Sequence, residues 1–120
     1  MTESLGRQGE DWAAAYLRRR GIDVVESHFQ TRWGEIDLIG RQGDTWIFVE
    51  VKTRTRQALP SAADAITPAK QKKLVNAALS YMKKNRLEGE NMRFDALLIE
   101  AGRVEWIAGA FDASASPYRF

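Results

Sequence analysis

The sequence contains no cysteine, one histidine and three prolines among its 120 residues. The absence of cysteine excludes a disulfide framework and a thiolate metal site. No apolar run approaches the roughly 20 residues that a membrane-spanning helix requires. The first residues, MTESLGRQGEDW, also lack the apolar segment of a secretory signal. We therefore expect a cytoplasmic protein with no membrane partner.

The composition is that of a globular chain, with 44% hydrophobic and 28% charged residues. Its length fits one domain with a modest core, so we expect a single domain over residues 1–120. The net charge is only +2, but residues 52–86 carry nine basic residues and one acidic residue. Such a block suits a polyanionic partner, although a solvated, lysine-rich helix face gives the same composition.

The apolar pattern predicts two helices and five strands. Spacings of three and four predict a helix over residues 4–20, and Thr67 followed by Pro68 predicts the start of a second, which runs to about Asn85. Runs with strand character cover residues 22–29, 35–40, 45–53, 93–99 and 104–107. The order α-β-β-β-α-β-β predicts an α/β fold with a central mixed sheet of about five strands flanked by helices. The crossover from the third strand to a parallel fourth is expected to be right-handed.

Three carboxylates and a lysine interrupt the apolar strands of the stretch GEIDLIGRQGDTWIFVEVKTR. Side chains alternate between the two faces of a strand. With a two-residue turn at residues 42–43, the commonest hairpin loop length, Glu35 lies opposite Glu50. The four ionic side chains then share one face. Asp37 and Glu50 become diagonal neighbours at roughly 7–8 Å, a span that one divalent cation can bridge.

Clustered carboxylates repel one another, so fold stability does not call for this arrangement. It makes sense around a cation, and oxygen ligands with no cysteine or nearby histidine favour Mg²⁺ or Mn²⁺. Lys52 follows Glu50 by two residues and points to the same place, where an ammonium can orient or deprotonate a water, or stabilise a phosphate oxygen. The pattern indicates metal-assisted phosphodiester hydrolysis. Surface ion pairs on a wet sheet face are the structural alternative, which the apolar flanking residues disfavour.

Two more polar residues lie on the apolar stripes of the predicted helices. Glu10 precedes Ala13 by three positions, and Gln71 precedes Leu74 by three. Each alone is a boundary residue, and together they could complete a metal site and hold a water or a phosphate. His28 has no matching cysteine or second histidine, and we interpret it as a structural residue of its strand.

The arrangement of Asp37 followed by Glu50-Val51-Lys52 resembles the motif of the PD-(D/E)XK nuclease superfamily, with Ile36 at its variable first position. The segments GRQGEDWAAAYLRRRG, GEIDLI, FVEVKTR, ITPAKQKKL, RFDALLI and VEWIAGAF resemble the YraN-like family of small bacterial endonuclease-like proteins over nearly the whole chain. The resemblance implies a restriction-endonuclease-like fold and a metal-dependent endonuclease. Archaeal Holliday-junction resolvases are similar in outline, which makes branched DNA a candidate substrate.

The resemblance also implies roles for individual residues. Asp37 and Glu50 correspond to metal ligands and Lys52 to the catalytic lysine. Glu10 corresponds to the acidic residue that such nucleases often carry on the first helix, a further ligand. Gln71 resembles the helix glutamine found in some branches, which places it with the catalytic set.

Basic residues near the site are expected to contact the phosphates of a nucleic acid, namely Arg32, Arg54, Arg56 and Lys70. Ordinary surface charge is the alternative interpretation of these residues. DNA is expected over RNA, and a homodimer is expected if the substrate is a junction, because junction cutting needs two sites. The alternative function is a non-catalytic nucleic-acid-binding module or an interaction subunit with the same fold. Intact Asp37, Glu50 and Lys52 argue against it.

Overall fold

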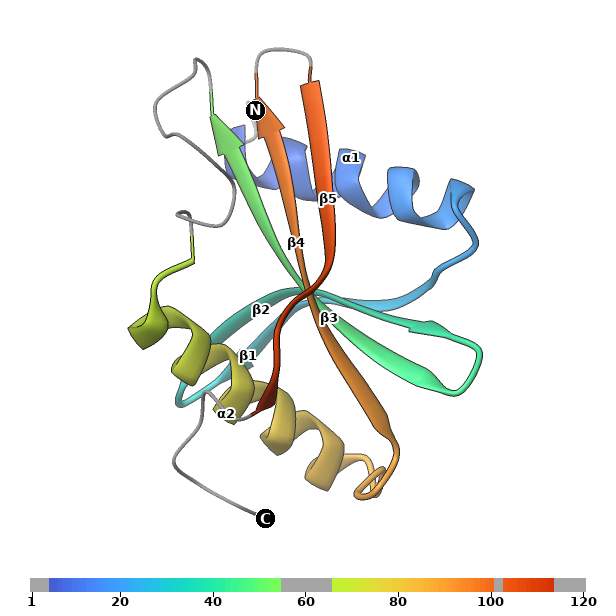
Figure 1. The fold of residues 1–120 in the computed structure, drawn as a ribbon, viewed down its shortest axis with the longest axis vertical. Helices are drawn as coiled ribbons and strands as arrows, with labels where there is room; N and C mark the ends of the chain where they lie inside the picture. The colour runs from blue at the N-terminus through green and yellow to red at the C-terminus, as the bar shows by residue number, and fades with distance from the viewer. Residues whose placement is uncertain (1–4, 55–65, 101–102, 114–120) are drawn as a thin grey trace.

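The computed structural model describes residues 5–54, 66–100 and 103–113, and it confirms the predicted order of elements. The elements are α1 (Leu5–Arg19), β1 (Asp23–Thr31), β2 (Gly34–Gln42), β3 (Thr45–Arg54), α2 (Pro68–Lys84), β4 (Asn91–Glu100) and β5 (Arg103–Phe111). The five strands form one sheet in the order β1-β2-β3-β4-β5 (Figure 1). As predicted, β3 and β4 are parallel, and the other neighbouring strands are antiparallel.

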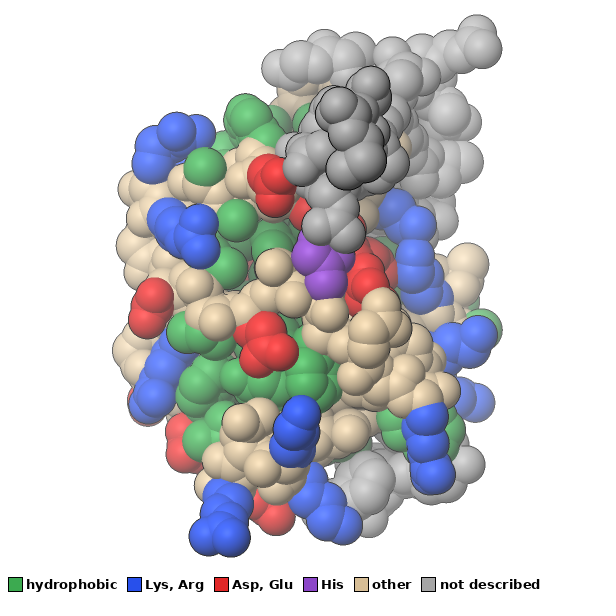
Figure 2. Space-filling model, turned by 180° about the vertical axis from the view of Figure 1, so that it is seen from behind, with side chains coloured by type: hydrophobic (Ala, Val, Ile, Leu, Met, Phe, Trp, Pro, Cys, Tyr) green, Lys and Arg blue, Asp and Glu red, His purple; other side chains and the backbone are tan. Residues whose placement is uncertain are grey.

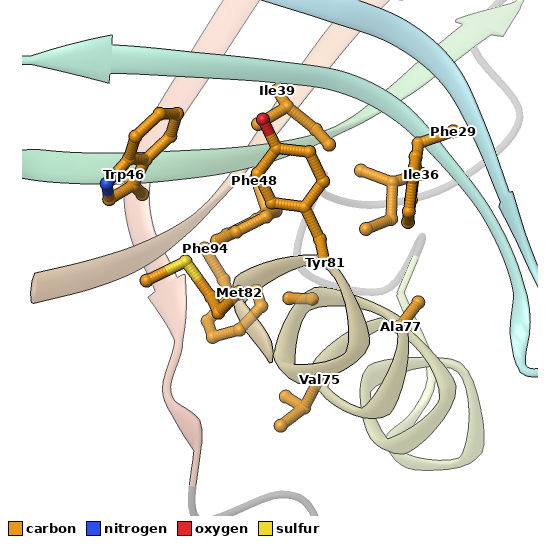
Figure 3. Close-up of a cluster of buried hydrophobic side chains, with 11 residues drawn as sticks. Phe29, Ile36, Ile39, Trp46, Phe48, Val75, Ala77, Tyr81, Met82 and Phe94 are labelled. Carbon is orange, nitrogen blue, oxygen red and sulfur yellow. The ribbon is translucent and has the colours of Figure 1, made fainter. Parts of the chain in front are cut away.

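The two helices cover opposite faces of the sheet. One core cluster joins α1 to the sheet through Leu17, Leu38 and Ile47, and the other joins α2 through Tyr81, Phe48 and Phe94. Figure 3 shows the second cluster, in which the Tyr81 ring meets the Phe48 ring nearly at a right angle, with 5.9 Å between centroids. The central strand β3 is thus buried on both sides, which explains its nearly continuous apolar sequence.

The start of α2 is fixed by the cap that the sequence predicts. The Thr67 side chain accepts a hydrogen bond from the backbone N–H of Lys70, at 3.2 Å, and Pro68 occupies the first helical position. Proline suits that position because its missing N–H would have no partner there. This start places Lys70 in the first turn of α2.

The predicted register of the β2–β3 hairpin is wrong by two residues. Gln42 pairs with Thr45, so the two-residue turn is Gly43-Asp44 rather than Gln42-Gly43. Gly43 adopts a φ of 60°, which glycine accepts most readily, and it begins the turn instead of ending it. Because moving the turn by one residue shifts the pairing by two, the paired residues 38–42 and 45–49 keep their predicted faces.

Both outer strands of the sheet are irregular. In β1 the register shifts between Val24 and Glu26, which leaves Val25 exposed. The pairing of β4 with β5 shifts between Phe94 and Ala96, and Gly109 of β5 has a φ of 64°. Bulges of this kind break the hydrogen-bond ladder and increase the local twist of a strand.

A buried carboxylate holds the irregular part of β5 to β4. Asp95 is 1% exposed, and its oxygens accept two hydrogen bonds from the Arg93 guanidinium, one from the Trp106 indole and one from the backbone N–H of Gly109, each at 2.9 Å. Every contact is charge-assisted, which compensates for burying the carboxylate.

Alanine in place of Gly9 is expected to destabilise the fold, because α1 approaches β3 closely at this glycine. A Cβ there would overlap Oγ1 of Thr53 and lie 3.3 Å from its Cβ. Overpacking of this kind costs about 1–3 kcal/mol, whereas alanine in an open helix would gain roughly 1 kcal/mol over glycine. Urea unfolding measures whether the substitution lowers or raises the free energy of unfolding. The double variant with Thr53→Ala should recover most of the loss, and a stabilised single variant would contradict the prediction.

Candidate active site

Asp37 lies where β2 and β3 separate. The ladder between these strands runs from Gln42–Thr45 to Leu38–Val49, and Figure 1 shows the strands diverging beyond it. There the backbone N–H of Val51 donates to Oδ2 of Asp37, at 2.8 Å. A side-chain oxygen thus takes a position that a strand carbonyl would otherwise fill, and the carboxylate is held beside β3.

Glu50 meets Asp37 in this opening. The two side chains are hydrogen-bonded, and they are only 6% and 8% exposed. Burial, followed by the hydrogen bond to Asp37 and the repulsion from it, raises the pKa of Glu50 to about 8. Burial also raises the pKa of Asp37, although hydrogen bonds from Glu50 and Val51 oppose that rise. The corrected register, continued by one position, sets the two residues directly across from each other.

Glu10 brings a third carboxylate from α1. Its charge and its hydrogen bond to Asp37 both contribute to the raised pKa of that residue. Oε1 of Glu10 also lies 2.8 Å from Nε2 of His28. The structure therefore gathers Glu10, Asp37 and Glu50, which come from three separate elements, into one acidic group.

Two lysines stand beside the acidic group. Nζ of Lys70 lies 3.2 Å from Oε2 of Glu50. A hydrogen bond to Lys70, together with partial burial, lowers the pKa of Lys52, because a second positive charge nearby disfavours its ammonium form. Lys70, expected as a phosphate contact, thus also pairs with one of the carboxylates.

The other predicted site residues have different surroundings. Nε2 of Gln71 donates to the backbone carbonyl of Ile66, at 3.1 Å, so its amide supports the start of α2. The Arg32 guanidinium lies over the Trp33 ring, 4.8 Å from its centroid. Arg54 ends β3, and Arg56 lies outside the described residues.

His28 is the site neighbour that the sequence interpretation missed. It lies in β1 with a φ of 55°, and its ring nitrogens face Glu10 at 2.8 Å and Glu35 at 3.3 Å. The tight turn between Thr31 and Gly34 is the feature that could have revealed this position, and the sequence interpretation did not use it. A hairpin closed there continues back to place His28 opposite Asp37.

The donor set fits a hard divalent cation. Glu10, Asp37 and Glu50 offer carboxylate oxygens, which Mg²⁺ and Mn²⁺ prefer. A positive ion would also offset the repulsion that contributes to the raised pKa values of Asp37 and Glu50. A cavity of about 110 Å³ between β2 and α2 reaches Glu50 and is lined by Trp33, Lys70 and Lys73 among others. A ligand can therefore approach the carboxylates from a side that carries basic residues.

Among helices of the described residues, none is long and apolar enough to cross a membrane.

Among solved structures, the chain is similar to Hjc of Archaeoglobus fulgidus, a Holliday junction resolvase from an archaeal hyperthermophile. The TM-score is 0.54 and the sequence identity 16%, over 95% of this chain and 88% of that one. At this identity the likeness establishes a shared fold, which confirms the predicted nuclease-like architecture.

The sequence itself is similar to bacterial proteins along nearly its whole length. It is 44% identical over 112 residues to a UPF0102 protein of Nitrosomonas eutropha, covering 92% of this chain and 96% of that one. It is 42% identical over 106 residues to a UPF0102 protein of Shewanella loihica, covering 88% and 92%. Residues 9–99 match the model of the uncharacterised protein family UPF0102, the YraN family of the predicted resemblance. The chain belongs to this family.

Proposed function

We propose that this chain is a metal-dependent endonuclease that hydrolyses phosphodiester bonds in nucleic acid, with DNA as substrate and branched DNA as the form to test first. The observation that carries the proposal is the buried Asp37–Glu50 pair where β2 and β3 separate. Two ionised carboxylates in contact away from water destabilise a fold unless a cation joins them, and the pair otherwise retains a proton. Lys52, two residues further along β3, adds an amine to the two carboxylates, and phosphodiester hydrolysis can use all three groups.

Each side chain has a proposed task. Glu10, Asp37 and Glu50 would hold Mg²⁺ or Mn²⁺, which when bound polarises a phosphoryl oxygen and neutralises its developing charge. The lowered pKa of Lys52 moves its amine toward the range in which it accepts a proton from an attacking water. Lys70 would leave Glu50 as the cation binds and contact a phosphate instead.

The charge around the site supports a polyanionic substrate. Lys70 and Lys73 line the cavity that reaches Glu50, and Trp33 forms part of the same wall. Basic side chains attract phosphates, and a neutralised carboxylate group no longer repels them. The fold shared with a resolvase supports DNA, and junctions in particular, as the first substrates to examine.

The test is cleavage of labelled duplex, single-stranded, flap and four-way-junction DNA, with an RNA duplex for comparison. Each substrate is incubated with Mg²⁺, with Mn²⁺ or with EDTA. We expect metal-dependent cutting of at least one DNA, and none by Asp37→Asn purified in the same way. That variant controls for contaminating nucleases, and Asp44→Asn at the exposed hairpin turn is its matched control.

The opposite result is equally definite. Binding of DNA that is unaltered by EDTA and by Asp37→Asn, with no cutting of any substrate, would reject the enzyme. It would favour a nucleic-acid-binding module that retains the nuclease fold. Cutting that survives in Asp37→Asn would show that the activity does not come from this site.

A further inference from the structure

The imidazole of His28 lies between two carboxylates at the edge of the acidic group. Nε2 is 2.8 Å from Oε1 of Glu10, and Nδ1 is 3.3 Å from Oε1 of Glu35. We propose that Glu10, His28 and Glu35 form a second metal-binding site, which takes a divalent first-row transition metal such as Zn²⁺ and is distinct from the all-oxygen set of Asp37 and Glu50. The proposed nuclease activity assigns no task to His28 or Glu35.

The distances among the three side chains suit one ion. Each residue offers one ligand atom, and these atoms all lie within 4.8 Å of one another. Zinc binds nitrogen and oxygen at about 2.0–2.2 Å, so ligand atoms of one ion lie roughly 3–3.5 Å apart. Side-chain rotations that move atoms by about 1 Å would close the set, and one ring nitrogen would keep its proton.

The surrounding backbone and a neighbouring amide hold the ligands in place. His28 has a φ of 55°, a conformation that side chains other than Asn, Asp and His adopt rarely. Gln30 donates a hydrogen bond to Oε2 of Glu35, which leaves Oε1 directed at the histidine. Partners of this kind orient the ligands of a metal site.

An ion can reach these residues from solvent. The side chains of Glu10, His28 and Glu35 are 13%, 24% and 34% exposed. A cavity of about 460 Å³ between α1 and β1 borders Glu10 and His28, and its wall also carries Asp11 and Glu26. Figure 2 shows this face, with the histidine beside acidic side chains. The excess of carboxylates over the single Arg18 of the wall favours a cation.

The ligand types decide which metal the site takes. Imidazole suits Zn²⁺ and its transition-metal neighbours, whereas Mg²⁺ prefers oxygen and retains its water. Glu10 belongs to both sets, so occupancy of one is expected to affect the other. That coupling rests on the proposed function, whereas binding of Zn²⁺ at His28 does not.

The single histidine makes a direct test simple. A chain without a polyhistidine tag is titrated with ZnCl₂ and with MgCl₂ while the ¹⁵N and ¹H resonances of the imidazole are followed. We expect Zn²⁺ to shift the ¹⁵N resonance of the ring nitrogen that coordinates it, and Mg²⁺ to leave the ring resonances unchanged. Calorimetry should give about one Zn²⁺ per chain at this site, with affinity reduced at least about 10-fold in Glu35→Gln and in His28→Asn. Asparagine tolerates the left-handed backbone of residue 28.

Two further variants separate this site from the proposed nuclease centre. The double variant Asp37→Asn/Glu50→Gln disables the oxygen set, and we expect it to keep Zn²⁺ binding and the imidazole shift. Asp44→Asn, an exposed acid at the turn between β2 and β3, should bind like the wild type. Zn²⁺ binding that disappears in the double variant, or that is indifferent to both Glu35→Gln and His28→Asn, would overturn the proposal. Absence of DNA cleavage by the wild type, with intact Zn²⁺ binding, would instead contradict only the proposed function.

Discussion

Alanine in place of Lys52 is expected to lower the rate of DNA cleavage at least about 100-fold while the protein stays folded. Proton transfer by a positioned side chain typically contributes 10²–10⁴-fold to a rate, and Lys52 is the lysine that shares the face of Asp37 and Glu50. Its side chain is only partly buried, so truncation removes little packing. The measurement is the single-turnover cleavage rate on the best substrate, with folding checked by circular dichroism.

Arginine at the same position separates two roles of this lysine. Lys52→Arg keeps the positive charge but cannot lose a proton, so it should be as inactive as Lys52→Ala if the amine accepts a proton. A rate restored to within a few-fold by arginine would instead assign Lys52 to charge stabilisation. Lys83→Ala, at the other end of α2, is the matched control and should cleave normally. Normal cleavage by Lys52→Ala would contradict both roles.

The stability of the metal-free protein is expected to fall as the pH rises from about 5 to about 8. Glu50 has a pKa of about 8 in the fold, against 4.5 when unperturbed. Between these values the folded chain holds a proton that the unfolded chain has lost, so a rising pH favours unfolding. Each pKa unit corresponds to about 1.4 kcal/mol, which gives a total on the order of a few kcal/mol. Urea unfolding at several pH values, in EDTA, measures the slope.

Glutamine in place of Glu50 should remove most of that slope, because a neutral amide of similar shape has no proton to lose. The variant is therefore expected to be more stable than the metal-free wild type at pH 8, although it has lost a candidate ligand. Mg²⁺ should stabilise the wild type at pH 8 and have little effect on the variant. Glu88→Gln, an exposed acid after α2, should keep the wild-type slope. An equal slope in Glu50→Gln would assign the pH dependence to other groups.

The order of elements could be predicted from the sequence because each element carries its own local signal. Thr67 and Pro68 form a cap that predicts the start of α2. The apolar run of β3 predicts a strand, and it matches the burial of this strand on both faces. The last strand was predicted over residues 104–107 but extends from Arg103 to Phe111. That extension depends on Asp95, whose contacts with Trp106 and Gly109 hold an irregular edge that no local pattern reveals.

The candidate site was predictable where strand alternation alone determines the geometry. Asp37, Glu50 and Lys52 share a face in either register, since the error in the turn shifted the pairing by an even number of residues. The positions of His28 and Lys70 depend on how β1 and α2 pack around the hairpin. A single sequence does not show how separate elements pack against each other. The contact of His28 with Glu10 and that of Lys70 with Glu50 therefore became visible only in the structure.

The bulges at both margins of the sheet bear on how copies of this chain could associate. A strand at the margin is a template for pairing with another chain, and irregular backbone makes it a poor one. Here the irregularities fall in β1, around Val25, and in β5, around Gly109. Two copies are therefore disfavoured from merging their sheets into one continuous sheet. If the proposed function involves a pair of copies, association through side chains of the helices or turns, with each sheet left separate, is favoured.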